Sequence, residues 1–338
     1  MKLPLRFAVI GCGFMGSIHA RNIARSEAAE LVFCCDVNLK RATQLQEELG
    51  AGLVTDDPAV VLTDKAIDVV VIATPHHNHA ELATAAAQRG KHILLEKPMA
   101  TTVADCLAVE RAVAAAGVRM ILGFKFRFAQ AVCQAKMLVP KPILLVCQCL
   151  HDGDGSNSSW LLDRSQSGGS LFDTLVHTVD LIRFLSGSDP VRVYAEGCNT
   201  KLDRHAGADN AVATVRLANG ATASIVEGKS ATSGLLSKWC IQVVGPSKNV
   251  TIHDHFLRVR EHRVGVEPDP EEFIYPLSNP HEVGTAALLA ELLEAIHSER
   301  PASPGPRDGA LSVLVCRQLE RSIASGQPEP VVLPPVGS

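Results

Sequence analysis

The chain has 338 residues, and 32 Lys and Arg residues nearly balance 36 Asp and Glu residues, for a formal net charge of −4. This balance argues against nucleic acid as a partner and against a polybasic membrane patch. The sequence has no run of about eighteen apolar residues, so we expect no membrane span. The length suits two domains.

The cysteines indicate the compartment. The ten cysteines include no Cys-x-x-Cys pair, and Cys147 and Cys149 alternate within an apolar stretch, which places both on one face of a strand. The first residues run directly into a glycine motif, so we expect no cleaved signal peptide. These features predict a cytoplasmic protein with buried, reduced thiols.

A glycine motif, Gly-Cys-Gly-Phe-Met-Gly, occupies residues 11–16 and is followed twenty positions later by Asp36. The flanking strand, helix and strand are predicted over residues 7–10, 17–25 and 31–35. In such a unit Gly11 makes the tight turn, Gly13 admits a pyrophosphate, and Gly16 allows close packing. Asp36 is placed to accept hydrogen bonds from the adenosine ribose and to repel a 2′-phosphate. The pattern predicts a dinucleotide, NAD in preference to NADP.

Strands and helices continue to alternate up to residue 122. Helices are predicted over 39–49, 80–89 and 102–117, and strands over 68–73, 93–95 and 119–122. Thr102 with Asp105 resembles a capping box, and Gly90 and Gly117 are typical helix ends. The alternation predicts a doubly wound parallel sheet.

Glu96, Lys97 and Pro98 directly follow the strand predicted over 93–95, which we expect to be buried on both faces. The ends of such strands open onto the ligand crevice. A cation next to a proline, the residue before which cis bonds occur, is a candidate for a positioned catalytic charge. The alternative is a surface lysine that enters a turn.

Three histidines lie within the four residues 76–79, at a strand-to-helix turn. They cannot easily converge on one ion, and we expect no acidic ligand to assist them, so we expect no metal. We prefer the interpretation that these residues form a loop beneath a nicotinamide and provide polar caps for the next helix.

The pattern changes after residue 124. Strands are predicted over 143–150, 191–197, 211–217, 221–227, 239–244 and 249–252. Asn219-Gly220 is a strong hairpin signal. Consecutive strands imply a mostly antiparallel or mixed sheet. We expect one helix-covered face and one broad open face, through which the chain would form a homodimer or homotetramer.

A helix predicted after Gly168-Gly169 carries Asp173, His177 and Asp180 at i, i+4 and i+7, on one face. Leu175, Val179 and Ile182 form a core stripe on roughly the opposite side. An ordinary ion pair of Asp173 with His177 is one reading. A catalytic role is the other, and it is favoured by the two glycines, which permit close approach of a ligand.

Taken together, these motifs resemble the glucose–fructose oxidoreductase / inositol dehydrogenase / MocA (Gfo/Idh/MocA) family over nearly the whole length. The resemblance rests on residues 11–16, Ala73-Thr74-Pro75 with Asn78-His79, Gly90-Lys91-His92, Glu96-Lys97-Pro98, and Gly168-Gly169 with Asp173, His177 and Asp180. In the family the lysine lies between nicotinamide and substrate, usually before a cis proline. Leu175 departs from many members, which have glycine there, and this puts the shape of the substrate pocket in doubt.

The resemblance implies a Rossmann domain over residues 1–124 and an α+β substrate-binding and oligomerisation domain over 125–338. The catalytic residues implied are Lys97, Asp173 and His177. The cofactor-binding residues implied are Gly11, Gly13, Phe14, Met15, Gly16, Asp36, Thr74, Pro75, Asn78, His79, Glu96 and Lys97. The candidates for substrate binding are Arg127, Trp160, Arg164, Asp173 and His177, with Asp163 and Lys238 as further candidates; for the residues other than Asp173 and His177 a packing role is an equal alternative.

The implied reaction is reversible oxidation of a secondary alcohol of a sugar or cyclitol. His177 would be the general base, Asp173 would orient its ring and bind substrate hydroxyls, and Lys97 would stabilise the developing alkoxide. An NAD-dependent glycosidase and a non-catalytic dinucleotide-binding sensor are the alternatives. The helical patterns over 283–298 and 308–325 are assigned to the second domain, with packing against the first domain as the alternative. The segments 152–160 and 202–208 predict no substrate preference. The segment 227–238 is rich in Ser, Gly and Leu, and a mobile loop over the site and a plain hairpin connection are equal alternatives for it.

Overall fold

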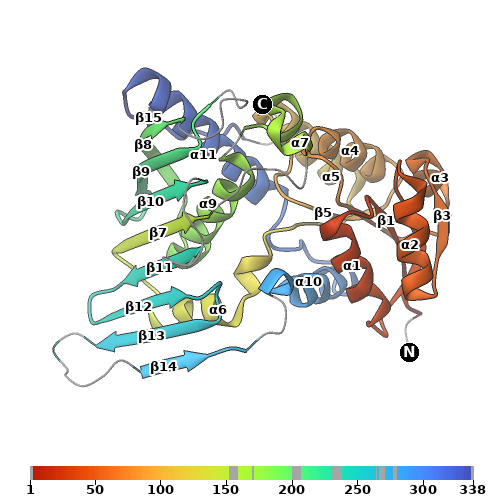
Figure 1. Ribbon diagram of the computed structural model, residues 1–338, viewed down its shortest axis with the longest axis horizontal. Helices are drawn as coiled ribbons and strands as arrows, with labels where there is room; N and C mark the ends of the chain where they lie inside the picture. Colours follow the sequence, from red (N-terminus) through yellow and green to blue (C-terminus); the bar gives the residue numbers. More distant parts are fainter. Residues whose placement is uncertain are drawn as a thin grey trace. The chain divides into compact units, whose positions relative to one another are not determined.

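The computed structural model describes residues 3–151, 159–169, 171–199, 207–229, 238–263, 265, 271–276 and 280–335. The chain divides into two compact units. The first comprises Met1–Lys125, Thr285–Ala310 and Pro335–Ser338, and the second comprises Phe126–Gly284 and Leu311–Pro334. Each unit has its own sheet (Figure 1).

Among the described residues, six parallel strands form the sheet of the first unit, in the order β3-β2-β1-β4-β5-β6. They are β1 (Leu5–Ile10), β2 (Ala29–Cys35), β3 (Leu53–Thr55), β4 (Val69–Ile72), β5 (His92–Leu95) and β6 (Met120–Leu122). Every residue of β4 and β6 is buried, which explains their continuous apolar sequences. The strand order reverses between β1 and β4, so the predicted doubly wound sheet is confirmed.

The helices of this sheet are α1 (Phe14–Ala24), α2 (Leu39–Leu49), α3 (Pro58–Thr63), η1 (His76–Asn78), α4 (His79–Gln88) and α5 (Val103–Ala116). Thr102 caps α5, because the Asp105 amide donates to Thr102 Oγ1 at 3.1 Å, and the Thr102 hydroxyl contacts Asp105 Oδ2 at 2.6 Å. Gly117 ends the same helix in the left-handed region. Within the residues described, no helix is long and apolar enough to cross a membrane.

The helix α10 (Thr285–His297) belongs to the first unit, whereas the sequence pattern assigned it to the second domain. Its buried leucines pack against α1, β5 and β6. The Asn22 amide donates to Thr285 Oγ1 at 2.9 Å, and the Leu122 amide of β6 donates to Pro304 O at 2.9 Å. The assignment failed because an apolar stripe does not show which surface it will cover.

The second unit is built on a mixed sheet in the order β14-β13-β12-β11-β7-β10-β9-β8-β15. Its strands are β7 (Leu144–Leu150), β8 (Pro190–Cys198), β9 (Asn210–Leu217), β10 (Thr222–Gly228), β11 (Trp239–Val244), β12 (Lys248–His253), β13 (Arg258–Arg263), β14 (Glu271–Ile274) and β15 (Glu329–Pro330). Strands β7 and β10 pair in parallel, and the other described pairs are antiparallel. The Asn219-Gly220 turn joins β9 to β10, as predicted. The mostly antiparallel sheet is confirmed.

The helices of the second unit are η2 (Lys125–Phe128, whose first residue belongs to the first unit), α6 (Gln130–Leu138), α7 (Ser159–Leu162), α8 (Arg164–Ser167), α9 (Phe172–Ser186), η3 (Pro280–Glu282) and α11 (Pro306–Ser325, which begins in the first unit). Figure 1 shows α6, α9 and α11 on the same face of the sheet. Contacts of α6 with β12 and β13, and of α9 with β7 and β10, place the core between these layers. The helix α9 is buried on nearly all sides, beyond the single apolar stripe expected for it.

Candidate active site

The glycine loop after β1 has the geometry that a bound pyrophosphate requires. A side chain at Gly11 would lie 2.4 Å from Ala73 O, and one at Gly16 would lie 1.7 Å from Gly11 O. Both glycines are therefore required by close packing of the loop against β4 and of α1 against the loop. A side chain at Gly13 would meet nothing within 4 Å, so this backbone stays open to a ligand. The first turn of α1 has no side-chain cap, which leaves its N–H groups available to phosphate.

Asp36, at the end of β2, is buried and held by the backbone. Its Oδ2 accepts a hydrogen bond from the Cys12 amide and its Oδ1 accepts one from the Asn38 amide, both at 2.8 Å. Each carboxylate oxygen retains a further lone pair that a ribose hydroxyl can use. The negative charge lies beside the glycine loop, where it disfavours a second phosphate. These residues fit a dinucleotide with an unmodified ribose.

Glu96, at the end of β5, is buried in a polar contact that the sequence analysis did not find. Its Oε1 contacts His19 Nε2 on α1 at 2.8 Å, and both side chains are buried. Burial would raise the pKa of Glu96, but the hydrogen bond from His19 and the charges of His19, Lys97 and Lys125 lower it to about 2. Glu96 therefore stays ionised and acts by anchoring the strand end. The signal in the sequence is a histidine three residues after Gly16.

Lys97 follows this anchor, and its own amide donates to Glu96 Oε2 at 3.2 Å. The Lys97–Pro98 peptide bond is cis. A side chain at Gly123 would lie 2.7 Å from the same Glu96 carboxylate, so the residue that follows β6 must have no side chain. Lys97 is thus placed at the carboxyl edge of the parallel sheet by buried neighbours.

His79 has a positioning role in addition to its predicted place in the cofactor site. Its side chain is fully buried, with Nδ1 at 2.7 Å from Pro98 O and Nε2 at 2.9 Å from Thr74 O. Burial lowers its pKa, and the two carbonyl oxygens and Glu96 oppose that shift. The ring therefore ties the Thr74-Pro75 loop to the loop that contains Lys97. Asn78 ends η1 directly before it.

In the second unit, α9 carries the other predicted catalytic residues. It begins at Phe172, with Leu171 directly before it, and Gly168 and Gly169, shortly upstream, both have positive φ. Arg317 Nη1 donates to Gly168 O at 2.9 Å and secures this entry. His177 is 6% exposed, whereas Asp173 is more accessible. Their spacing of four residues places them on one face of the helix, as predicted.

Aromatic rings surround one side of His177. Its ring lies 4.5 Å from the Phe126 ring and 6.4 Å from the Trp239 ring, between centroids. Phe126 also packs on Phe256 at 4.4 Å. Such packing limits the rotation of the imidazole and gives it an apolar surrounding. These three aromatic residues were missed, because their positions come from different elements.

The other candidates for substrate binding have different environments. The Arg127 guanidinium is buried in a bidentate ion pair with Asp180, with Nε at 2.8 Å from Oδ2. This ion pair explains the buried charge of Asp180 and joins η2 to α9. Trp160 is half-buried on α7. Arg164 lies at the start of α8, where Asp163 caps the helix, and its Nη2 lies 3.1 Å from Glu320 Oε2. The roles of these residues in substrate binding stay predictions.

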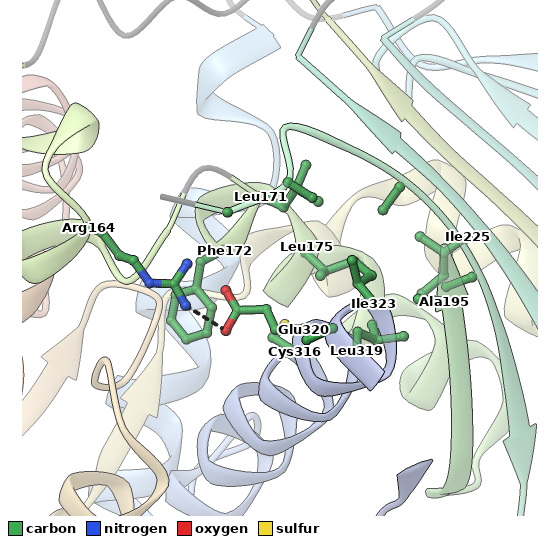
Figure 2. Close-up of a pocket in the computed structure, with 15 residues that line it drawn as sticks. Arg164, Leu171, Phe172, Leu175, Ala195, Ile225, Cys316, Leu319, Glu320 and Ile323 are labelled. Carbon is green, nitrogen blue, oxygen red and sulfur yellow. Dashed lines mark hydrogen bonds and ion pairs between the residues drawn. The ribbon is translucent and has the colours of Figure 1, made fainter. Parts of the chain in front are cut away.

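An apolar cavity of about 360 Å³ lies between α9, α11 and the sheet (Figure 2). Arg164 and Glu320 stand at one side, and the rest of the wall is almost entirely apolar. The sheet side is formed largely by small residues, among them Ala195 and Ala213, which face each other across β8 and β9. Leu175 lines this cavity. The cavity is therefore a gap in the helix–sheet core on the side of α9 that carries its apolar residues.

Comparison with known proteins identifies both halves of the chain. Residues 5–124 match the family described as "Oxidoreductase family, NAD-binding Rossmann fold", and residues 141–248 match "GFO/IDH/MocA C-terminal domain". A scyllo-inositol 2-dehydrogenase (NAD(+)) of Bacillus subtilis (strain 168) is 30% identical over 243 residues, covering 69% of this chain and 70% of that protein. A myo-inositol 2-dehydrogenase of Thermotoga maritima is 26% identical over 327 residues, covering 94% of this chain and 96% of that protein.

The fold is also that of a solved structure. A levoglucosan dehydrogenase in complex with NADH has a TM-score of 0.88 to this chain, at 23% identity, and the match covers 98% of this chain and 100% of that chain. At this identity the likeness is evidence for the fold of both units.

We expect His19→Ala to lower the free energy of unfolding by about 3 kcal/mol, because it leaves the buried Glu96 carboxylate unpaired. The double variant His19→Ala, Glu96→Gln should lose less than the sum of the two single variants. Urea unfolding followed by circular dichroism measures all three. A coupling energy near zero would contradict the ion pair.

The same pair predicts a pH dependence. The pKa of Glu96 falls from 4.5 to about 2 on folding, so its contribution to stability is present above pH 4.5 and is lost as the pH falls towards 2. The stability difference between the wild type and Glu96→Gln should shrink over that interval. A difference that stays constant between these two pH values would refute the assignment.

We expect Ala213→Val to raise the free energy of unfolding by about 1 kcal/mol, because its added methyl groups enter the apolar cavity. Ala223→Val is the matched control: Ala223 is a buried strand residue that does not line the cavity, so the larger side chain should destabilise by overpacking. Urea unfolding followed by Trp fluorescence measures both. Equal destabilisation by the two variants would show that the cavity is already filled.

Proposed function

Because the chain belongs to the Gfo/Idh/MocA family of NAD-binding oxidoreductases, we propose that it transfers hydride between nicotinamide and a secondary alcohol of a cyclitol or sugar. NAD, when bound, supplies the hydride acceptor at C4 of its nicotinamide. The substrate class is proposed from the inositol dehydrogenases among the relatives. The direction in the cell follows from the concentrations of alcohol, ketone, NAD and NADH and from the pH.

Three residues of this chain would each have a separate role in the reaction. His177 takes the proton of the reacting hydroxyl, since an imidazole is the side chain whose ordinary pKa suits a base near neutrality. Asp173 accepts hydrogen bonds from substrate hydroxyls. Lys97 donates to the oxygen on which negative charge develops, and a compact ammonium group with three donors suits that task.

The observation that carries the proposal is the environment of Lys97. A lysine that only entered a turn would not need buried polar contacts on both sides. The preceding residue, Glu96, is nevertheless buried in contact with His19. On the other side, the His79 ring contacts the carbonyl oxygen of Pro98. In the second unit, the Arg127–Asp180 pair and the aromatic rings restrain α9 and His177 in the same way. Bringing these two sets of residues to one substrate is part of the proposal.

Assembly and location are also proposed. The helices cover the sheet face that carries Ala213 and Ile225, so the opposite face presents Val212 and Val226, which pair across β9 and β10. Val212 is 57% exposed. Covering such a face in a homodimer or homotetramer would remove apolar surface from water. The ten cysteines are all free thiols, which suits the reducing cytoplasm.

Lys97→Met tests the reaction. NADH formation is first measured over a panel of inositols and sugars to find a substrate. The variant should then lose about a thousandfold in kcat, as expected when a group that stabilises the developing charge is removed. Unchanged turnover would refute the catalytic role of Lys97. Undetectable wild-type turnover across the panel would favour a non-catalytic sensor.

Asp36→Asn tests the preference for NAD. This variant retains one carbonyl oxygen as an acceptor for the loop amides, whereas alanine would remove both acceptors. Without the negative charge, the ratio of kcat/KM for NAD to that for NADP should fall about tenfold or more. Glu48→Gln, at an exposed ion pair of α2 with Arg21, is the control and should leave the ratio unchanged. An unaltered ratio in Asp36→Asn would contradict the proposed preference.

A further inference from the structure

Glu227 is a buried carboxylate that the proposed reaction does not use. It lies on β10 with 1% of its surface exposed, and its carboxylate faces α9. Thr178 Oγ1 donates to Glu227 Oε2 at 3.0 Å. The other oxygen, Oε1, is buried and has no hydrogen-bond partner among the described residues. A carboxylate so placed requires an explanation beyond packing.

The polar and titratable groups around Glu227 come from several elements, and Cys147 on β7 is one of them. Thr174 and Thr178 face it from α9, Cys149 from β7 and Cys316 from α11, and Lys229 is the charged side chain that acts on it. Lys238 acts on the neighbouring Cys149. Burial raises the pKa of Glu227 to about 7, and the two threonines and Lys229 limit the shift. The carboxyl therefore changes charge within the range in which enzymes work.

The two threonines directly follow the two residues assigned to the reaction. Thr174 comes after Asp173, and Thr178 comes after His177, so both pairs repeat at the four-residue spacing of a helix. The hydrogen bond to Thr178 therefore restrains the rotation of the helix that carries both neighbours. Glu227 also lies in one cross-strand row with Cys149 and Trp239, and Trp239 packs against His177. Glu227 thus acts on the surroundings of His177 through the helix and through the sheet.

We propose that Glu227 is a positioning residue, whose carboxylate holds α9 through Thr178 and so fixes Asp173 and His177 for the reaction. The proposal rests on the function proposed above for Asp173 and His177. In it, Glu227 touches neither substrate nor cofactor. Protonation of Glu227 weakens its hydrogen bond with Thr178 and so shifts the position of the His177 ring.

The effect on stability separates this role from an ordinary structural hydrogen bond. The folded pKa of about 7 exceeds the ordinary 4.5, so the contribution of Glu227 to stability is present below pH 4.5 and is lost as the pH rises through 7. Glu227→Gln should therefore be at least as stable as the wild type above pH 7, while its active site is less well ordered. A merely structural bond would give the opposite change in stability.

The decisive experiment observes His177 without turnover. The imidazole signals of histidine-labelled protein are followed by NMR as a function of pH, and His177→Asn assigns the signal. In the wild type the His177 signal should show a second titration with a midpoint near 7, and Glu227→Gln should lack it. Superimposable curves would overturn the proposal. Because no substrate is needed, this failure is distinct from failure of the proposed function, which would appear as absent wild-type turnover.

Kinetics provide the second measurement once a substrate is known. At about pH 8.5, Glu227→Gln should reduce kcat about tenfold with little change in KM for NAD, and the reduction should disappear at about pH 6, where the wild-type carboxyl is itself neutral. Thr178→Val should reproduce the loss, and Thr178→Ser should restore activity. Glu261→Gln is the control, since Glu261 is also buried but pairs with Lys248 on β12. A loss independent of pH would overturn the proposal.

Discussion

The contact between Glu96 and His19 is the constraint on which the first half of the site depends. One buried carboxylate joins α1 to the end of β5, accepts the amide of Lys97 and occupies the space left by Gly123. A charge at this depth is tolerated only with a partner. The pair therefore links α1 to the loop that contains Lys97, the two elements that we propose to contact the two ends of the dinucleotide.

The second unit uses the same principle with different residues. The helix α9 is held at its middle by the Arg127–Asp180 pair, and Arg317 holds the loop before it. Side chains that would act on a substrate stand on elements whose own polar contacts are buried and satisfied. Reacting groups held in this way lose little further freedom when a ligand binds, which is the condition for efficient orientation.

Local sequence patterns predicted most of the architecture, because glycine spacing, capping residues and buried strands are read over a few residues. Strand β3 and helix α3 were missed, since three to six residues show too little periodicity. His19 and Glu227 were missed for another reason: their partners, Glu96 and Thr178, lie 77 and 49 residues away. Catalytic candidates on recurring motifs were therefore visible in the sequence, whereas the buried groups that hold them were not.

The helix α10 belongs to the first unit but follows most of the second unit in the sequence, and this order has a consequence for synthesis on the ribosome. The edge strand β6 donates a hydrogen bond from its Leu122 amide to Pro304 O. The dinucleotide-binding unit therefore lacks α10 and this contact until residues 285–310 have been made. At ordinary translation rates this delay is on the order of ten to forty seconds after Lys125 emerges. During that time the surfaces of α1, β5 and β6 that α10 covers are exposed, so nascent chains stalled in this interval would be substrates for chaperones. A fragment that ends at residue 124 would keep those surfaces exposed permanently.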